Sequence, residues 1–459
     1  MAFKGGDMRE TVSDYDASRG PRRFFVLCVC VSGMFSLVVG LLMPTVLRGA
    51  YADLVQYYSG AMHILDGSPS EMYPIPTPDA DKTGRHPGWT EGSTLGPKTL
   101  QLHEANHVPT NGSRFIQPPV AAVLVVPVAL FPYGPALRLW GVLSLLALWL
   151  SAVQAGWIYR LLVGRVTYAA GVVVLATAIS ARTVLTAMIG NSASFVPVLL
   201  GFLLIDFIGT RQRWFGPAAL VVAVMAKTVV APLGICYFVL RRWGGVAMGA
   251  LATLGLVAAS LPFTGWVAWE RYLILSKAFD RPFGIAPLAG FVASVLGRPM
   301  TDPAITWCVR AGFLFPIVVL ACGLAWRRRA SGGPVAAALS LVALSAALLA
   351  SPIFWQVYLT FAFPWFGWMA FEATRRSALR WWALAIMAVI LLPTGPILRL
   401  LGLAEPWDSY PTYACLATMG FGLAYLLIRE PSRGQSEVAS LFESPTSPVP
   451  ATDGKLTST

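Results

Sequence analysis

Long apolar segments alternate with polar links along most of this chain. The segments lack the two-residue period of a half-buried strand and the 3.6-residue period of an amphipathic helix, so they predict helices that are apolar on all sides. About 20 helical residues cross the hydrocarbon of a bilayer, and many of the segments approach that length. The pattern predicts an all-α polytopic membrane protein.

About 12 segments are expected to cross the membrane, with both termini in the cytosol. Their approximate bounds are 24–46, 116–132, 138–158, 166–185, 193–209, 216–240, 245–262, 307–326, 334–350, 353–371, 381–399 and 411–428. A single transmembrane domain, 24–428, therefore follows a cytosolic segment, 1–23. It precedes a tail, 429–459, that is rich in Ser, Pro and Thr and is expected to be disordered. Two large polar loops, 47–115 and 263–306, interrupt the domain.

The charges fit a membrane location. Only 12% of residues are charged, against about 25% in soluble domains. The net charge of +12 would suggest a nucleic-acid partner, but the basic clusters flank apolar segments. These clusters are Arg22-Arg23, Arg241-Arg242, Arg327 to Arg329 and Arg375-Arg376. Because cytosolic loops carry an excess of Lys and Arg, we expect a multi-pass cell-membrane protein with no nucleic-acid partner and with both large loops outside.

One region conflicts with this topology, because simple counting places Arg160, Arg165, Arg211 and Arg213 outside. The conflict disappears if 116–132 is a re-entrant or interfacial helix and if 216–240 breaks near Lys227. Both arrangements keep the two large loops outside the cell.

No metal site or cofactor is predicted. The six cysteines all lie in apolar segments, so neither a disulfide framework nor a zinc site is expected. His103 and His107 lie four residues apart in what resembles a loop, without a third ligand at a fixed spacing.

Asp53 is the first candidate for chemistry, because it follows the first apolar segment at the outer membrane boundary. A carboxylate placed there can take a proton from an acceptor hydroxyl, although a helix cap or a solvated acid would show the same pattern. Tyr57 is expected either to bind substrate or to anchor the segment at the interface.

Lys227 is the second candidate. A lysine in the middle of an apolar segment costs about 2.5–3.5 kcal/mol to insert, so an anion such as a phosphate, or snorkelling to the interface, should offset that cost. Pro232 suggests that the helix breaks there. In the second large loop, Lys277 and Arg281 are candidates for a lipid phosphate, or equally for anionic headgroups. Gln117 at a Pro-Pro helix start and Asn191 in a polar break are weaker candidates for substrate binding.

Several blocks in this order make the chain similar to glycosyltransferase family 87, in the GT-C superfamily. They are Asp53 to Gly67 with Tyr73, Phe115 to Ala122 with Pro127, Gly190-Asn191, Ala226-Lys227, and Ser351 to Trp355 with Tyr358. The resemblance implies a GT-C-like bundle with a large first extracytoplasmic loop. It also implies an inverting transfer of a sugar, typically mannose, from a polyprenyl-phosphate donor to an extracytoplasmic glycan or glycolipid.

Carried over to this chain, the resemblance makes Asp53 the general base and Lys227 the group that stabilises the leaving phosphate. Many family members have a His pair after the last block, where this chain has Val357 and Tyr358. If a histidine orients the acceptor or the phosphate in these relatives, that function is either missing here or provided by Gln356, Tyr358 or a histidine of the outer loop.

Two other classes of function are alternatives to the enzyme. A transporter or flippase would need polar residues lining a path through the membrane on several helices. A scaffold without catalytic activity would bind a partner through the long outer loop.

Overall fold

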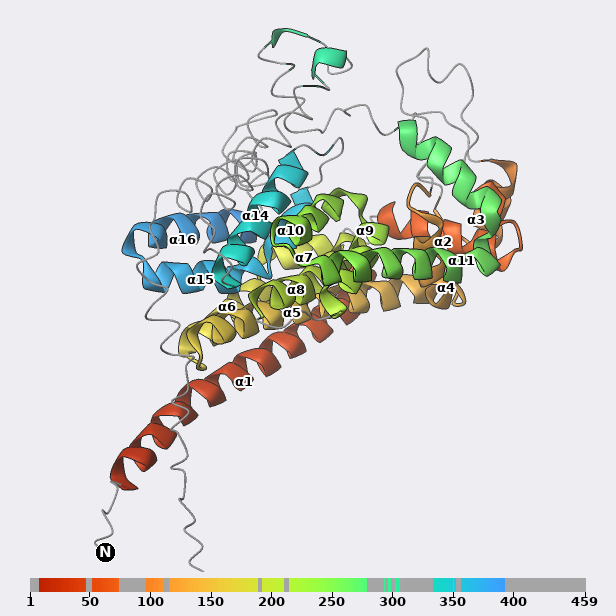
Figure 1. The fold of residues 1–459 in the computed structure, drawn as a ribbon. Coiled ribbons are helices and arrows are strands. Elements are labelled where there is room, and N and C mark those ends of the chain that lie inside the picture. Colours follow the sequence, from red (N-terminus) through yellow and green to blue (C-terminus); the bar gives the residue numbers. More distant parts are fainter. Residues whose placement is uncertain are drawn as a thin grey trace, which may run out of the picture.

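The computed structural model describes residues 8–46, 52–73, 96–109, 115–188, 192–209, 214–278, 333–349 and 356–392, together with 293, 296–298, 302–305, 307 and 351. All regular elements in this part of the chain are helices, which confirms the predicted all-α class (Figure 1).

The longer helices surround a core to which short 3-10 helices, labelled η, also contribute. In chain order the elements are α1 (Met8–Val46), α2 (Ala52–Leu65), η1 (Pro69–Met72), α3 (Pro97–Ala105), α4 (Pro119–Ala129), α5 (Tyr133–Val163), α6 (Tyr168–Ala178), α7 (Ala181–Met188), η2 (Ser192–Phe195), α8 (Val196–Ile208), α9 (Phe215–Ala226), η3 (Thr228–Gly234), α10 (Ile235–Val239), α11 (Trp243–Ala278), α14 (Gly333–Leu349), η4 (Gln356–Ala362), α15 (Trp365–Arg375) and α16 (Ser377–Leu391).

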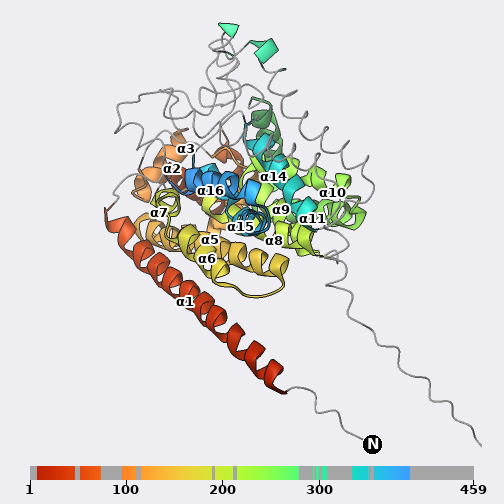
Figure 2. The same cartoon turned by 90° about the vertical axis from the view of Figure 1, so that its left-hand side faces the viewer.

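The first helix lies along one side of the bundle. α1 packs against α5 and α6, while its N-terminal part extends away from the other helices (Figures 1 and 2). The indole N–H of Trp149 on α5 donates to the Ser32 hydroxyl on α1 at 3.2 Å. A polar contact of this kind holds two apolar helices in register where lipid supplies no hydrophobic driving force.

Small residues allow the core helices to approach closely, as is common between membrane helices. A Cβ atom added to Gly367 of α15 would lie 2.0 Å from the carbonyl oxygen of Ala155 on α5. Glycine is therefore required where these two helices cross. α5 itself begins after Pro132 and ends at Gly164, whose φ of 79° is a left-handed conformation that terminates helices.

Three helices in the described part are long and apolar enough to cross a bilayer: Arg19–Leu42, Tyr133–Val163 and Trp243–Ser276. A fourth would be formed by Tyr168–Ala178 and Ala181–Ala187, which are bent by 42° relative to each other. The remaining apolar helices in this part of the chain are shorter. The predicted count of about 12 crossings remains a prediction, and the segments at 308–326 and 411–428 lie outside the described residues.

The segment predicted at 216–240 is broken, as in the second of the two topologies. α9 ends at Ala226, and Lys227 takes an extended conformation with φ −147° and ψ 102°. The chain continues in η3, which contains Pro232, and proline provides no backbone N–H for a continuous α-helix. The segment predicted at 116–132 is likewise reduced to the short helix α4.

The predicted polar loops contain more helix than their sequence suggested. Residues 47–115 include α2, η1 and α3, so His103 lies in a helix and its expected place in a loop was wrong. α11 continues to Ala278 through the first part of the predicted loop 263–306, with a non-helical residue at Gly265. Charged residues lower the hydropathy of this stretch but do not prevent it from forming a helix. Hydropathy predicts contact with lipid, and it does not by itself predict whether a segment is helical.

Candidate active site

Asp53 and Tyr57 lie on one face of α2, at the end of the bundle where α2, α3 and α4 gather (Figure 1). Asp53 is in the first turn of α2, where an acidic side chain interacts favourably with the helix dipole. Tyr57 follows four residues later, and residues with this spacing are neighbours on a helix surface. The start of α2 therefore presents a carboxylate and a phenol in the same direction.

Three hydrogen bonds hold the Asp53 carboxylate, and all reach the same oxygen. Oδ2 accepts from the backbone N–H of Ser192 at 3.2 Å, from the Ser192 hydroxyl at 3.0 Å and from Lys227 Nζ at 2.9 Å. Oδ1 has no hydrogen-bond partner among the residues that the structure describes. The side chain is 14% exposed, so the carboxylate is fixed through one oxygen and reachable at the other.

Lys227 lies at the break between α9 and η3, with its side chain 7% exposed. Its ammonium group is 5.9 Å from the ring centroid of Tyr57 and 5.8 Å from that of Tyr358. Both distances lie within the usual range for cation–π attraction. A carboxylate and two aromatic rings together compensate a buried cation that would be costly in an apolar environment.

Tyr57 ties the three segments of the cluster together. Its hydroxyl donates to the carbonyl oxygen of Ala226 at 2.8 Å, and the Ser192 hydroxyl lies 2.9 Å away. Because the Ser192 hydroxyl carries one proton, it donates to Asp53 or to Tyr57 at any one moment. The α9 break, the start of α2 and the start of η2 are thereby fixed relative to one another.

This arrangement offers a base and a cation side by side. The carboxylate can accept a proton at Oδ1, and the ammonium group can neutralise an anion that replaces Asp53. No cluster of three or more His, Cys, Asp or Glu side chains suited to a metal ion occurs among the described residues.

The structure brings together four of the residues that we predicted from sequence, Asp53, Tyr57, Lys227 and Tyr358. The backbone carbonyl of Gln117 accepts a hydrogen bond from the Tyr73 hydroxyl at 2.6 Å.

The remaining predicted residues stay predictions. Asn191 and Arg281 lie outside the described residues. Lys277 and Gln356 are described only as positions in α11 and η4.

Ser192 is a site residue that we did not predict from sequence. It provides two of the three donors to Asp53, through its N–H and its hydroxyl. The only sequence signal was the adjacent polar break at Gly190-Asn191, since a serine next to an apolar segment is common and carries no pattern of its own.

The comparison with known families gives one result. The model of glycosyltransferase family 87 matches residues 115–352, which is more than half of the chain and includes Ser192 and Lys227. Asp53, Tyr57 and Tyr358 lie outside the matched range. A search of curated proteins gave no match. On the strength of the family match and the apolar helices, the chain belongs to glycosyltransferase family 87 and is a membrane glycosyltransferase.

Proposed function

We propose that the protein transfers a sugar from a polyprenyl-phosphate donor to a glycan or glycolipid on the extracytoplasmic side of the cell membrane, with inversion at the anomeric carbon. Mannose is the leading candidate for the sugar. The observation that supports the proposal is the Asp53–Lys227 pair, in which a carboxylate and an ammonium group meet at 2.9 Å at a helix break.

In the proposed step, Asp53 Oδ1 takes the proton of an acceptor hydroxyl while the acceptor oxygen bonds to the anomeric carbon. The bond between that carbon and the phosphate oxygen breaks, and its electron pair remains on the phosphate. Lys227 stabilises the charge that develops on this leaving group, which is electrostatic help of the kind that usually contributes most to catalysis. The resident residues therefore supply both a base and a counter-charge without a metal.

The ion pair has to open for this step to occur. The acceptor oxygen, the anomeric carbon and the leaving oxygen must lie between the base and the cation, and reacting atoms alone are about 3–3.5 Å apart before bond formation. In our proposal the donor phosphate replaces Asp53 at Lys227. The carboxylate then loses its strongest partner and becomes a better base only when the donor is bound.

Tyr57 and Tyr358 would then surround the phosphate site, since their rings already flank Lys227. We propose that Gln117, Asn191 and Gln356 contribute to substrate binding. Lys277 and Arg281 are proposed as further contacts to the donor phosphate.

The test compares Asp53→Asn with Asp66→Asn in purified protein, using labelled polyprenyl-phosphate mannose and a panel of acceptors. Asp66 follows α2 and pairs with Lys98 at 2.6 Å, so its replacement removes an outer carboxylate away from the cluster. We expect Asp53→Asn to lower turnover by about 10²–10⁴-fold, the usual contribution of general base catalysis. We expect Asp66→Asn to retain activity.

Insertion into the membrane and thermal unfolding of both variants show whether a loss is chemical or structural. Normal transfer by a folded Asp53→Asn protein would contradict the proposed role of this residue. No turnover by the unmodified protein with any polyprenyl-phosphate sugar would contradict the donor class.

A further inference from the structure

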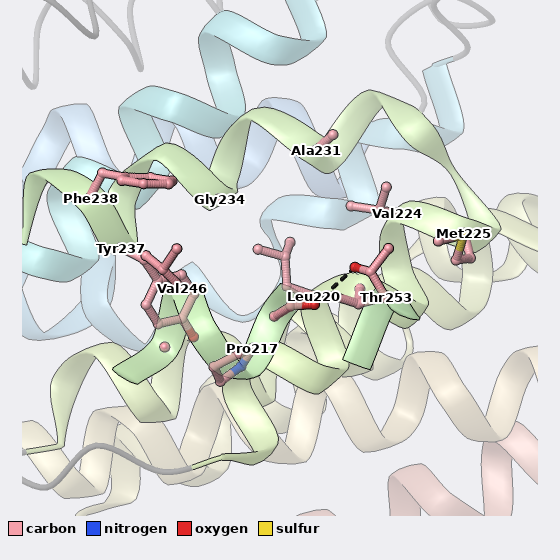
Figure 3. Close-up of a pocket in the computed structure, with 13 residues that line it drawn as sticks. Pro217, Leu220, Val224, Met225, Ala231, Gly234, Tyr237, Phe238, Val246 and Thr253 are labelled. Atoms are coloured by element: carbon pink, nitrogen blue, oxygen red, sulfur yellow. Dashed lines mark hydrogen bonds between the residues drawn. The ribbon is translucent and has the colours of Figure 1, made fainter. Parts of the chain in front are cut away.

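A lipid-accessible groove lies between α9, the η3–α10 segment and the first half of α11 (Figure 3). Its volume is about 240 Å³. The walls carry Leu220 and Val224 from α9, Phe238 from α10 and Val246 from α11. Phe238 is 52% exposed, so the groove opens at the surface of the bundle.

The polar side chains in the wall already have partners. The Thr253 hydroxyl donates to the carbonyl oxygen of Gly249 at 2.9 Å, and the Tyr237 hydroxyl donates to Asp206 Oδ2 at 3.0 Å. Each hydroxyl therefore already uses its single proton, and the rest of the lining consists of apolar side chains and glycines. A water molecule needs two to four polar partners to be held in a cavity, so the groove is suited to hydrocarbon.

The groove begins next to the Asp53–Lys227 pair. Met225 lines it, and the next two residues are Ala226, whose carbonyl binds Tyr57, and Lys227. From Met225 the wall of α9 runs back to Pro217, a distance of about 12 Å at 1.5 Å per helical residue. A ligand with its anionic head at Lys227 can thus place an attached apolar chain along α9.

The helix that forms the far wall exposes apolar side chains. Leu251 and Leu254 of α11 are 61% and 67% exposed, and α11 is long and apolar enough to cross a bilayer. An apolar chain can accordingly enter the groove sideways from the bilayer without crossing water.

We propose that this groove binds the phosphate-proximal part of the donor's polyprenyl chain. The inference rests on the proposed function and adds to it the place and the walls of the lipid site. We assign the donor's own chain to the groove because the groove starts at Met225, two residues from Lys227. A chain that is covalently joined to an anion bound at Lys227 would enter the groove at this end.

Two glycines of α11 provide a matched test. A Cβ atom added at Gly249 or at Gly255 meets no atom within 4 Å, so neither substitution causes a clash at that atom. Gly249 lines the groove, whereas Gly255 is exposed and lies away from it. Leucine at either position replaces the same helical glycine, so the effect on helix propensity is shared and only Gly249→Leu fills the groove.

The measurement is the KM for two donors, a full-length polyprenyl-phosphate sugar and a citronellyl-phosphate sugar with a short chain. We expect Gly249→Leu to raise the KM for the long donor about tenfold or more, because several buried methylene groups lose their contacts. The KM for the short donor should rise as well, because the groove holds the phosphate-proximal part of the chain, which both donors share. Gly255→Leu should match the unmodified protein with both donors. Equal values for Gly249→Leu and Gly255→Leu with the long donor would overturn the inference.

A second measurement separates this inference from the proposed function. Polyprenyl phosphate without a sugar, carrying a photoreactive group on its second isoprene unit, should cross-link to Leu220, Val224 or Thr253 in the full-length protein even if no turnover is found. Cross-links confined to other helices would overturn the groove assignment. Turnover that is absent while these cross-links form would instead overturn only the proposed reaction.

Discussion

At the scale of single residues, the two oxygens of Asp53 have different surroundings. Oδ2 carries all three recorded hydrogen bonds, and Oδ1 carries none among the described residues. A base needs both properties, since an oxygen that is held fixes the orientation and an oxygen that is free accepts the proton. Ser192 therefore qualifies as a positioning residue, because it touches the carboxylate through the oxygen that does not react.

Replacing Ser192 tests whether Oδ2 of Asp53 fixes the orientation of the carboxylate while Oδ1 accepts the proton. Ser192→Ala removes the hydroxyl donor and keeps the backbone N–H, so we expect kcat to fall about tenfold to a hundredfold, the effect of one hydrogen bond to a charged group. The KM for the donor should hardly change. Ser194→Ala is the control, because the buried Ser194 hydroxyl in the same 3-10 helix has no hydrogen-bond partner among the described residues. A matching loss in both variants would indicate a general effect on folding.

The sequence indicated the two charged residues of the cluster and not the serine between them. Asp53 and Lys227 stand out because a charge beside or inside an apolar segment is costly and needs a partner. A serine hydroxyl costs little in the same place, so nothing marked Ser192. The contact between Asp53 and Lys227 also joins residues that are 174 positions apart, and no local pattern reports such a distance.

At the scale of helices, hydropathy predicted the long apolar elements and missed the helices that are short or carry charges. The segment predicted at 138–158 corresponds to α5, and the proposed break near Lys227 is present. α2 and α3 were hidden in the outer loop because they have only 14 and nine residues, too few for a membrane span, although most of α2 is buried. The extension of α11 was missed because Glu270 and Arg271 lower its hydropathy.

His103, in the helix α3, has a pKa that differs between the folded and the unfolded chain. It is buried in α3 at 1% exposure, and neither ring nitrogen has a hydrogen-bond partner among the described residues. Burial and, to a smaller extent, the nearby His63 lower the pKa of His103 to about 4. Burial also lowers the pKa of His63, which bonds to Ser68 and Thr99. Folding therefore keeps His103 neutral in a range where an unfolded chain would bind a proton.

The pH dependence follows from this difference. Below pH 6.5 the unfolded histidine gains a proton that the folded one does not accept until about pH 4, so stability falls as the pH decreases between these values. We expect protease cleavage within residues 96–109 to accelerate over that range. His103→Phe, which keeps an apolar ring, should remove much of the change. An identical pH profile in both proteins would show that His103 does not cause it.

At the scale of the whole molecule, the proposal requires the α2 end of the bundle to face the outside. The basic clusters at Arg241-Arg242 and Arg375-Arg376 favour this orientation through the positive-inside rule. The structure contains no membrane, so the orientation rests on the charge pattern.

Cysteine labelling tests the orientation directly. In a chain whose six cysteines are replaced by alanine, we expect Glu71→Cys to react with a membrane-impermeant maleimide on intact cells. Thr374→Cys should react only after permeabilisation. Both positions are exposed, so access from one side of the membrane alone decides the result. The reverse labelling pattern would place Asp53 on the cytosolic side.

The bend in α11 at Gly265 has a consequence for how this enzyme could diversify. Before the bend the helix lines the lipid groove through Gly249, and after it Arg271 donates to the carbonyl of Ser70 while Tyr272 contacts Tyr73. In our proposal the part of α11 before the bend binds the donor lipid, whereas the part after it packs against η1, which contacts the helix that carries Asp53. We infer that substitutions after Gly265 would change the reaction end of the bundle and leave the binding of the carrier lipid as it is.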